Sequence, residues 1–203
     1  MKRSGPPEPA YKLPPDVTDA RERILRTAYE LFRNHGVSGI GVDRIVAEAG
    51  VAKTSLYRHF RSKDDLVLEV LERHEQIWLD WLEAEIARRG GTPQERILAV
   101  FDAFDEWFHQ RGYRGCLFVN TLLESHDRPG PIRAAAAEKL TDVRAVLRRL
   151  SHEAGLRNPD EFAHTLQLIM MGSIVAALDG RIESAKRAQT VTRVLLEEQT
   201  AAI

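Results

Sequence analysis

Two short helical patterns separated by a glycine, within residues 40–63, constrain the fold more than any other part of the chain. The first pattern places apolar residues at spacings of three and four, and these residues are Val42, Ile45, Val46 and Ala49. Gly50 follows, and glycine readily takes the left-handed conformation that ends a helix. Leu56 and Phe60 then mark the buried face of a second short helix. The arrangement predicts a helix-turn-helix, in which one helix supports another that can enter the major groove of DNA.

The second helix carries hydrogen-bond donors on the side opposite its apolar face. Thr54 and Ser55 are short enough to let the helix backbone approach DNA, and their hydroxyls can reach phosphates or base edges. The Arg58 guanidinium matches the O6 and N7 acceptors of guanine, so Arg58 is the best candidate for reading a base. Lys63, at the start of the next helix, is expected near a phosphate. The predicted DNA-binding residues are Arg44, Lys53, Thr54, Ser55, Tyr57, Arg58, His59 and Lys63.

A solvated amphipathic helix would show the same periodicity, but the distribution of charge favours DNA. Residues 18–63 carry nine Lys and Arg against five Asp and Glu, whereas residues 64–203 carry seventeen against twenty-three. The net charge of −1 is therefore the sum of a basic N-terminal region and an acidic region that follows it. Such asymmetry attracts one part of the protein to a polyanion and keeps the other part away from it.

Five short runs in this region form a known pattern. They are Gly36-Val37, Val42-Asp43-Arg44-Ile45, Ala49-Gly50-Val51, Leu56-Tyr57-Arg58-His59-Phe60 and Ser62-Lys63-Asp64-Asp65-Leu66. Together they resemble the N-terminal domain of the TetR family of transcriptional repressors, over about residues 19–68. The run LYRHFRSKDDL is the most specific part of the resemblance. Gly41 departs from it, because the family usually has Ser or Thr there, and glycine offers no side-chain cap. Thr54 stands where the family often has Gly or Pro.

Composition sets the class of protein. An apolar fraction of 43% can build a core, and a charged fraction of 29% is typical of a soluble protein. We expect no membrane span, because no stretch approaches about 18 apolar residues, and the N-terminus lacks an apolar signal segment. The single Cys116 excludes an intrachain disulfide and fits the reducing cytoplasm.

The chain is predicted to be all-α, with about nine helices in two domains. Residues 1–17 contain five prolines and are predicted to be a disordered arm, in which Lys2, Arg3 and Lys12 either reach a minor groove or only aid solubility. Residues 18–65 are the predicted DNA-binding domain, and residues 66–203 the predicted ligand-binding and dimerisation domain. The expected helices begin near Asp19, Val42, Lys53, Ser62, Pro93, Cys116, Ile132, Phe162 and Ser184. Asp19, Ser62, Thr92 and Asn158 are the predicted helix caps.

Two helices near the C-terminus carry more apolar surface than one chain readily buries. The predicted dimer interface contains Phe162, Leu166, Ile169, Ile174, Val191, Val194 and Leu195. Two such helices from each of two chains would make a four-helix interface. The family resemblance implies the same pairing, so we expect a homodimer.

Large apolar side chains in the second domain suggest a cavity for a small-molecule effector, although each can equally serve as ordinary core. The candidate ligand-binding residues are Trp78, Phe101, Phe104, Phe108, Cys116, Asn120 and Met170. Cys116 is either an inert buried thiol or a sensor whose pKa is lowered near Arg114. The seven histidines lack ligand spacing, so no metal and no cofactor are expected.

Competing classes of function fit less well. The chain has no Gly-rich phosphate loop, nucleophile elbow or zinc-protease motif, so we do not expect an enzyme. A nucleoid protein would be basic throughout, and an interaction module would not need the array from Tyr57 to Lys63. The sequence therefore favours a ligand-responsive regulator, most simply a repressor that a small, mostly apolar molecule releases from a palindromic operator in double-stranded DNA. It does not separate repressor from activator, or identify ligand, operator or target genes.

Overall fold

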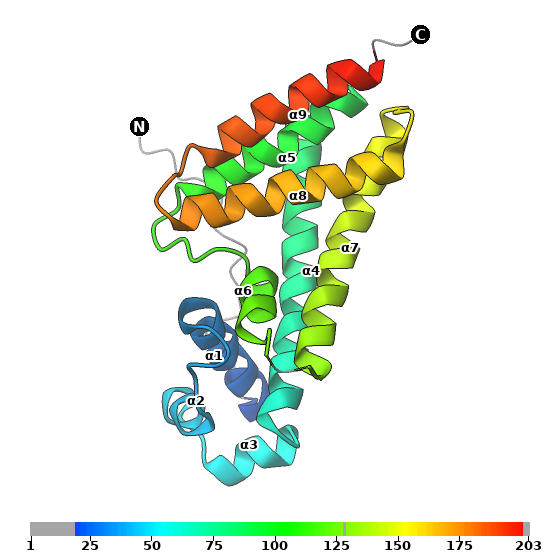
Figure 1. The fold of residues 1–203 in the computed structure, drawn as a ribbon. Coiled ribbons are helices and arrows are strands. Elements are labelled where there is room, and N and C mark those ends of the chain that lie inside the picture. The colour runs from blue at the N-terminus through cyan, green and yellow to red at the C-terminus, as the bar shows by residue number, and fades with distance from the viewer. Residues whose placement is uncertain (1–18, 128, 201–203) are drawn as a thin grey trace. The chain divides into compact units, whose positions relative to one another are not determined.

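The computed structural model describes residues 19–127 and 129–200, and within them the chain forms nine α-helices and no strand (Figure 1). The predicted all-α fold is therefore confirmed. The helices are α1 (Ala20–His35), α2 (Val42–Ala49), α3 (Lys53–His59), α4 (Lys63–Arg89), α5 (Pro93–Phe108), α6 (Leu117–Glu124), α7 (Pro131–Glu153), α8 (Pro159–Leu178) and α9 (Ser184–Thr200). The predicted arm at residues 1–17, with Lys2, Arg3 and Lys12, lies outside the described residues.

Local signals place most helix ends. The Asp19 carboxylate accepts a backbone N–H at the start of α1, and Ser62 Oγ accepts the Asp65 N–H at the start of α4. Thr92 opens α5 with the full capping box that its sequence predicts. Asn158 precedes α8 but makes no side-chain cap, and α8 begins at Pro159, three residues earlier than expected. Proline suits this first helical position because its missing N–H would have no partner there.

The described residues divide into two compact units. The head unit contains residues 19–78, 116–127 and 129–140, and the body unit contains residues 79–115 and 141–200. The sequence predicts a boundary between residues 65 and 66, whereas this division leaves the first part of α4, all of α6 and the start of α7 with the DNA-reading helices. Helix periodicity does not reveal such long-range packing.

The head unit is built on the apolar face predicted for α1. That face is buried, and its residues are Ile24, Leu25, Ala28, Leu31 and Phe32. Ile45 of α2 and Leu56 of α3 are fully buried, and α1 contacts both of these helices. Phe60, directly after α3, is also buried. The helix-turn-helix therefore has its own apolar support.

A buried polar contact lies deeper in the head unit. Tyr29 Oη of α1 and His74 Nδ1 of α4 form a hydrogen bond of 2.9 Å. The His74 ring also meets the edge of Phe118 in α6, with centroids 4.9 Å apart. Burial, together with the positive charge of Arg33, lowers the pKa of His74 to about 3. His74 is therefore neutral at physiological pH.

A second polar cluster of the head unit joins α7 to α4. The Lys139 ammonium donates to Glu72 and Glu75, each at 2.6 Å. Burial disfavours the charge on Lys139, but the two carboxylates outweigh burial and raise the pKa of the amine. Removing one partner of such a cluster would leave a partly buried charge without compensation.

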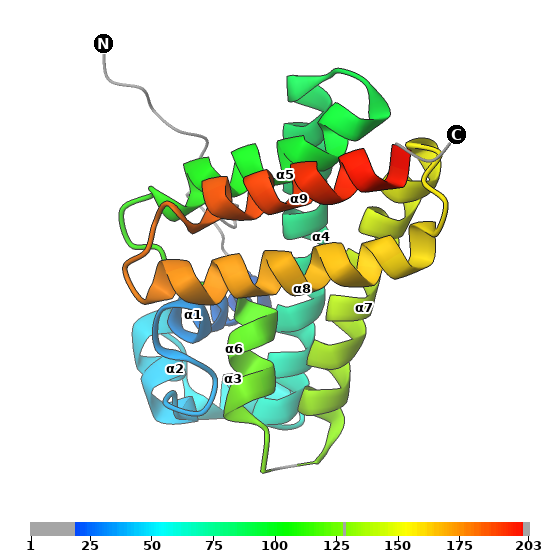
Figure 2. The same cartoon turned by 45° about the horizontal axis from the view of Figure 1, so that its top comes forward.

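The body unit packs α9 against both α5 and α8, which Figures 1 and 2 show side by side. Aromatic rings from α5 form its centre. Phe104 meets Phe101 and Trp107 edge to face, and Trp81 of α4 stacks on Phe104 with centroids 6.5 Å apart. Aromatic rings in offset or tilted contact stabilise the fold by more than the burial of their surface alone accounts for.

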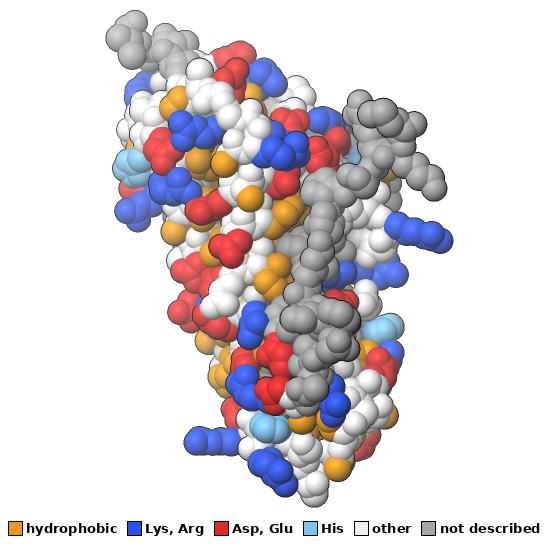
Figure 3. All heavy atoms as spheres, turned by 180° about the vertical axis from the view of Figure 1, so that it is seen from behind, with side chains coloured by type: hydrophobic (Ala, Val, Ile, Leu, Met, Phe, Trp, Pro, Cys, Tyr) orange, Lys and Arg blue, Asp and Glu red, His pale blue; other side chains and the backbone are white. Residues whose placement is uncertain are grey.

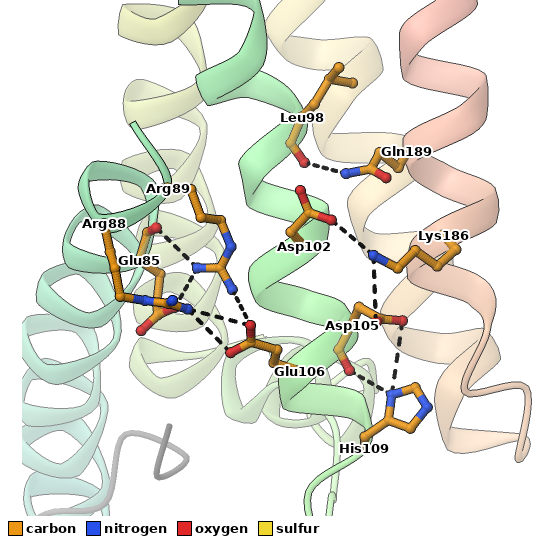
Figure 4. A network of polar contacts seen from close by, with 10 residues as sticks. All are labelled: Glu85, Arg88, Arg89, Leu98, Asp102, Asp105, Glu106, His109, Lys186 and Gln189. Atoms are coloured by element: carbon orange, nitrogen blue, oxygen red, sulfur yellow. Dashed lines mark hydrogen bonds and ion pairs between the residues drawn. The ribbon is translucent and has the colours of Figure 1, made fainter. Parts of the chain in front are cut away.

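Ion pairs link α5 to the end of α4 and to α9 (Figure 4). Glu85 pairs with Arg88 and Arg89, and Arg89 also reaches Glu106 of α5 at 2.8 Å. Lys186 of α9 donates to Asp102 of α5 at 2.9 Å. Side chains of both signs are interspersed over the face shown in Figure 3. The Lys186–Asp102 pair is exposed to water and adds little stability, whereas the side chains of Glu85 and Arg89 are only 9% and 13% exposed.

Helix α8 is long and apolar enough to cross a membrane by length and composition alone, with a mean hydropathy of 1.4 over 18 residues. The sequence analysis expected no such stretch, so α8 departs from that expectation. Less than half of that window is buried within the chain. Core helices of globular proteins pass the same test, so the finding carries no membrane assignment.

The neutral state of His74 predicts a pH dependence of stability. Its pKa is about 3 in the folded protein against 6.5 for the free side chain, so only the unfolded chain takes up this proton as the pH falls below 6.5. One such proton lowers the free energy of unfolding by about 1.4 kcal/mol per pH unit. We expect His74→Gln to remove this component between pH 6.5 and 5, measured by urea unfolding. The exposed His164→Gln is the matched control, and a His74→Gln effect that is constant with pH would contradict the assignment.

Candidate DNA-binding interface

The turn between α2 and α3 has the geometry that its sequence predicts. Gly50 takes the left-handed conformation, with φ of 63° and ψ of 40°. The N–H of Val51 donates to Val46 O at 3.1 Å, which closes the end of α2. Gly41 precedes α2 and makes no side-chain cap, as expected. The tight turn fixes the direction in which α3 leaves α2.

The outer face of α3 is open to solvent. Tyr57 is 48% exposed, and Arg58 and Thr54 are also exposed, whereas Ser55 and His59 are half-buried. Among the described residues, no hydrogen bond or ion pair engages the side chains of Tyr57 and Arg58. Leu56 anchors the opposite side of the helix and is fully buried. An unpaired guanidinium on a fixed short helix is well placed for direct readout of a guanine.

Two of the predicted DNA-binding cations are held by carboxylates. Arg44 Nε donates to Glu48 at 2.8 Å, one turn further along α2. Lys53 Nζ donates to Asp43 at 2.7 Å, and this hydrogen bond and the negative charge of Asp43 raise the pKa of Lys53. Both pairs lie at the surface, where phosphate can replace a carboxylate at little cost.

In the structure Lys63 has a partner that the sequence did not predict. Its ammonium donates to the backbone carbonyl of Val37 at 2.7 Å and lies 5.9 Å from the centre of the Phe32 ring. The side chain therefore folds back on the turn between α1 and α2. The position of Lys63 at a helix start predicts a phosphate contact. A sequence pattern does not show that the Val37 carbonyl also lies within its reach.

The same turn is held from the other side by a residue that the sequence did not single out. The N–H of Ser38 donates to Glu124 Oε2 of α6 at 2.8 Å. Gly36 has a φ of 77°, and a Cβ built there would lie 2.2 Å from Glu124 Oε1. The positive φ favours glycine at this position, and a Cβ there would push the Glu124 carboxylate away from the turn. Glu124 is separated from Ser38 by 86 residues, so no local signal could have paired them.

The predicted ligand-binding residues fall in both units. Trp78, Cys116 and Asn120 belong to the head unit, whereas Phe101, Phe104, Phe108 and Met170 belong to the body unit. All are buried except Asn120, which is half-buried. Within the body unit, the Phe104 ring lies 5.6 Å from that of Phe108, so these side chains serve as core.

The Cys116 thiol does not have the lowered pKa that a sensor requires. The side chain is 4% exposed, and burial raises its pKa to about 11, although two backbone N–H groups partly oppose this shift. The thiol is therefore protonated at neutral pH and a weak nucleophile. Among the described residues, no group of three or more His, Cys, Asp and Glu could hold a metal ion.

The predicted dimer residues also separate into two sets. Phe162, Leu166 and Ile174 are at most 5% exposed and belong to the core of their own unit, so they have almost no surface to offer a second chain. Helical spacing alone does not distinguish the inner face of α8 from its outer face. Val191 and Val194 are about half exposed, and Ile169 and Leu195 are half-buried. The structure adds further exposed apolar side chains on α8, which are Leu168, Val175 and Leu178.

The head unit therefore presents a helix-turn-helix with an exposed reading helix, which defines a DNA-binding protein. Residues 24–70 match the model of bacterial regulatory proteins of the tetR family, and residues 93–192 match a tetracyclin repressor-like C-terminal domain. The chain belongs to the TetR family of transcriptional regulators. It is a DNA-binding regulator and not an enzyme.

The similar proteins include both an activator and a repressor of transcription. The transcriptional activator FasR of Mycolicibacterium smegmatis is 31% identical over 170 residues, which cover 83% of this chain and 72% of FasR. The transcriptional repressor NemR of Escherichia coli is 32% identical over 130 residues, which cover 64% of this chain and 65% of NemR. Family membership therefore leaves the direction of regulation open.

Solved structures share the fold over most of the chain. A TetR-family regulator from Streptomyces coelicolor has a TM-score of 0.82 and 26% identity, covering 89% of this chain and 90% of its own. The structure of E. coli NemR has a TM-score of 0.78 and 28% identity, covering 86% of this chain and 95% of its own.

The hydrogen bond to Glu124 should stabilise the turn between α1 and α2. Glu124→Ala leaves the Ser38 N–H without its acceptor, so we expect a loss of about 1 kcal/mol in the free energy of unfolding. Glu124→Gln keeps an oxygen acceptor and should lose less. Glu138→Ala, at an exposed carboxylate of α7, is the control. Equal losses for all three variants in urea titrations would show that the contact does not stabilise the turn.

Proposed function

We propose that the chain is a homodimeric repressor that a small, mostly apolar molecule releases from a palindromic operator. The observation that carries the DNA part is the open face of α3, where the side chains of Tyr57 and Arg58 make no hydrogen bond or ion pair among the described residues. Repression needs only occupation of a promoter by the bound protein, whereas activation also needs a productive contact with polymerase. Arg58 is the proposed base-reading residue, with Thr54, Ser55 and His59 beside it.

In this proposal Arg44 and Lys53 contact phosphates by exchanging their carboxylate partners for DNA. The four side chains of these two pairs are exposed, so DNA can reach them. Lys63 also supports the shape of the head, because its ammonium holds the Val37 carbonyl. The phosphate contact expected for Lys63 from the sequence stays a prediction.

Dimerisation is supported by the apolar side chains that α8 and α9 leave exposed in one chain. They include Leu168, Val175, Val191 and Val194, each at least 48% exposed. A hollow beside them is lined by Ile169, Gly172, Ala176 and Val191. Self-association through this surface would remove these side chains from water. Two reading helices can then occupy half-sites about 34–36 Å apart.

The effector is proposed to act by favouring one conformation of the dimer over another. The aromatic and Met side chains of the core would accept an apolar molecule if that core opened around it. To convert a population of 1:99 into 99:1, the effector must bind the released state about 10⁴-fold more tightly. We place the protein in the cytoplasm, where the operator and a reduced Cys116 are found.

The reading role of Arg58 is tested by Arg58→Ala. Loss of a bidentate guanine contact should cost about 1–3 kcal/mol of operator affinity and relax the sequence preference. Binding would be measured by gel shift and fluorescence anisotropy with DNA flanking the gene. Arg111→Ala removes an equally charged, exposed residue from the body unit and should bind like the parent. If both variants bind alike, Arg58 does not read a base.

The dimer surface is tested by Val191→Glu. A carboxylate buried there without a partner should raise the dimer dissociation constant by more than about 100-fold. Sedimentation velocity at several protein concentrations gives this constant directly. Leu123→Glu places the same charge on an exposed leucine of α6 and should leave the dimer intact. A Val191→Glu protein that remains dimeric would move the interface elsewhere.

A further inference from the structure

The chain passes from the reading helix α3 into α4 through three residues, 60–62. The first of them, Phe60, has an extended backbone, and its N–H donates to Leu56 O at 2.9 Å. Phe60 is only 3% exposed, so its ring belongs to the core of the head unit. The position of this ring therefore helps to fix the direction in which α3 lies.

One side chain of α1 contacts both this ring and α4. Arg21 lies in the first turn of α1, and its Cζ is 5.2 Å from the centre of the Phe60 ring. A cation at this distance over an aromatic face is attracted by the ring. The same guanidinium donates to Glu69 Oε2 of α4 at 2.5 Å. Arg21 thus joins α1, the end of α3 and α4 at one point.

The chemistry of arginine suits this point. A guanidinium is planar, so its face can rest on a ring while its N–H groups bind a carboxylate, whereas a lysine ammonium has the charge without the plane. The side chains of Arg21 and Glu69 are 41% and 30% exposed. Ion pairs this accessible to water contribute little to stability. The contact therefore matters more for the direction of α3 than for the stability of the fold.

A second ion pair joins the same two long helices further from α3. Arg73 Nη1 of α4 lies 3.8 Å from Glu22 Oε1 of α1. Arg73 is one helical turn beyond Glu69 along α4, and its side chain is 35% exposed, close to the value for Arg21. Arg73 therefore provides a control with the same charge and a similar environment.

We propose that Arg21 is a positioning residue for DNA recognition, which sets the direction of α3 through Phe60 and Glu69. The role requires no contact between Arg21 and DNA, and it rests on α3 being the reading helix, as proposed above. Loss of the guanidinium would leave α3 folded but turned. Base contacts depend on that direction, whereas binding to DNA of any sequence depends mainly on phosphate contacts.

The direction of α3 can be tested without DNA. Residual dipolar couplings of backbone amides in the full chain report how α3 is oriented relative to α1. We expect Arg21→Met to change the couplings of α3 while its chemical shifts remain helical, and Arg21→Lys to change them less. Arg73→Met should leave them as in the parent. Unchanged couplings in Arg21→Met, or equal changes in Arg73→Met, overturn the proposal whether or not the protein binds an operator.

The effect on recognition is measured as a ratio of affinities. The numerator is the affinity for a duplex that the parent selects from a random-sequence library, and the denominator is that for a scrambled duplex of the same composition. We expect this ratio to be lower in Arg21→Met than in Arg73→Met by about threefold or more, because an ion pair and a cation–π contact are lost. If Arg21 instead contacts phosphate, both duplexes lose affinity alike and the salt dependence becomes shallower. That result overturns the positioning role.

Glu69→Gln separates the two roles further. A positioning Arg21 loses its anchor in this variant, so the ratio should fall although the head gains positive charge. An Arg21 that contacts phosphate would be released to bind both duplexes more tightly with the ratio unchanged, which overturns the proposal. If the parent selects no duplex at all, the operator proposal fails, and the couplings still decide the role of Arg21.

Discussion

The position of the reading helix depends on how the short turn between α1 and α2 is held. Lys63 binds its Val37 carbonyl from α4, and Glu124 binds its Ser38 N–H from α6. Lys63 donates and Glu124 accepts, so both contacts are hydrogen bonds between a charged side chain and the backbone, which are shorter and stronger than those between neutral groups. Because α2 begins only four residues after Ser38, any shift of this turn is passed to α2 and through Gly50 to α3.

Capping residues and turn glycines in the sequence predicted where the helices begin and end. The capping residues Asp19, Ser62 and Thr92 and the left-handed Gly50 act through atoms a few residues away, and all are found as expected. The all-α fold followed from the same spacing rules. Arg58 and Tyr57 were also correctly expected to be exposed, because Leu56 and Phe60 fix which side of α3 is buried.

Contacts between distant parts of the chain could not be predicted in this way. The hydrogen bond from Lys63 to the Val37 carbonyl joins residues 26 positions apart and has no local sequence signal. Phe162, Leu166 and Ile174 look like interface residues in a helix that is apolar on most sides, yet they fill the core of their own unit. Choosing between two apolar faces of one helix requires knowledge of its neighbours, which a single sequence does not contain.

The surface pairs Arg44–Glu48 and Lys53–Asp43 have a consequence for the energetics of DNA association. When phosphate takes either cation, a carboxylate is released close to the DNA and attracts a cation of its own from solution. Ion uptake at Glu48 and Asp43 then offsets part of the ion release from the duplex that drives binding. If Arg44 and Lys53 contact phosphates as proposed, the salt dependence of affinity should be shallower than the number of phosphate contacts implies, and binding should tolerate changes in ionic strength better than that of an unpaired basic helix.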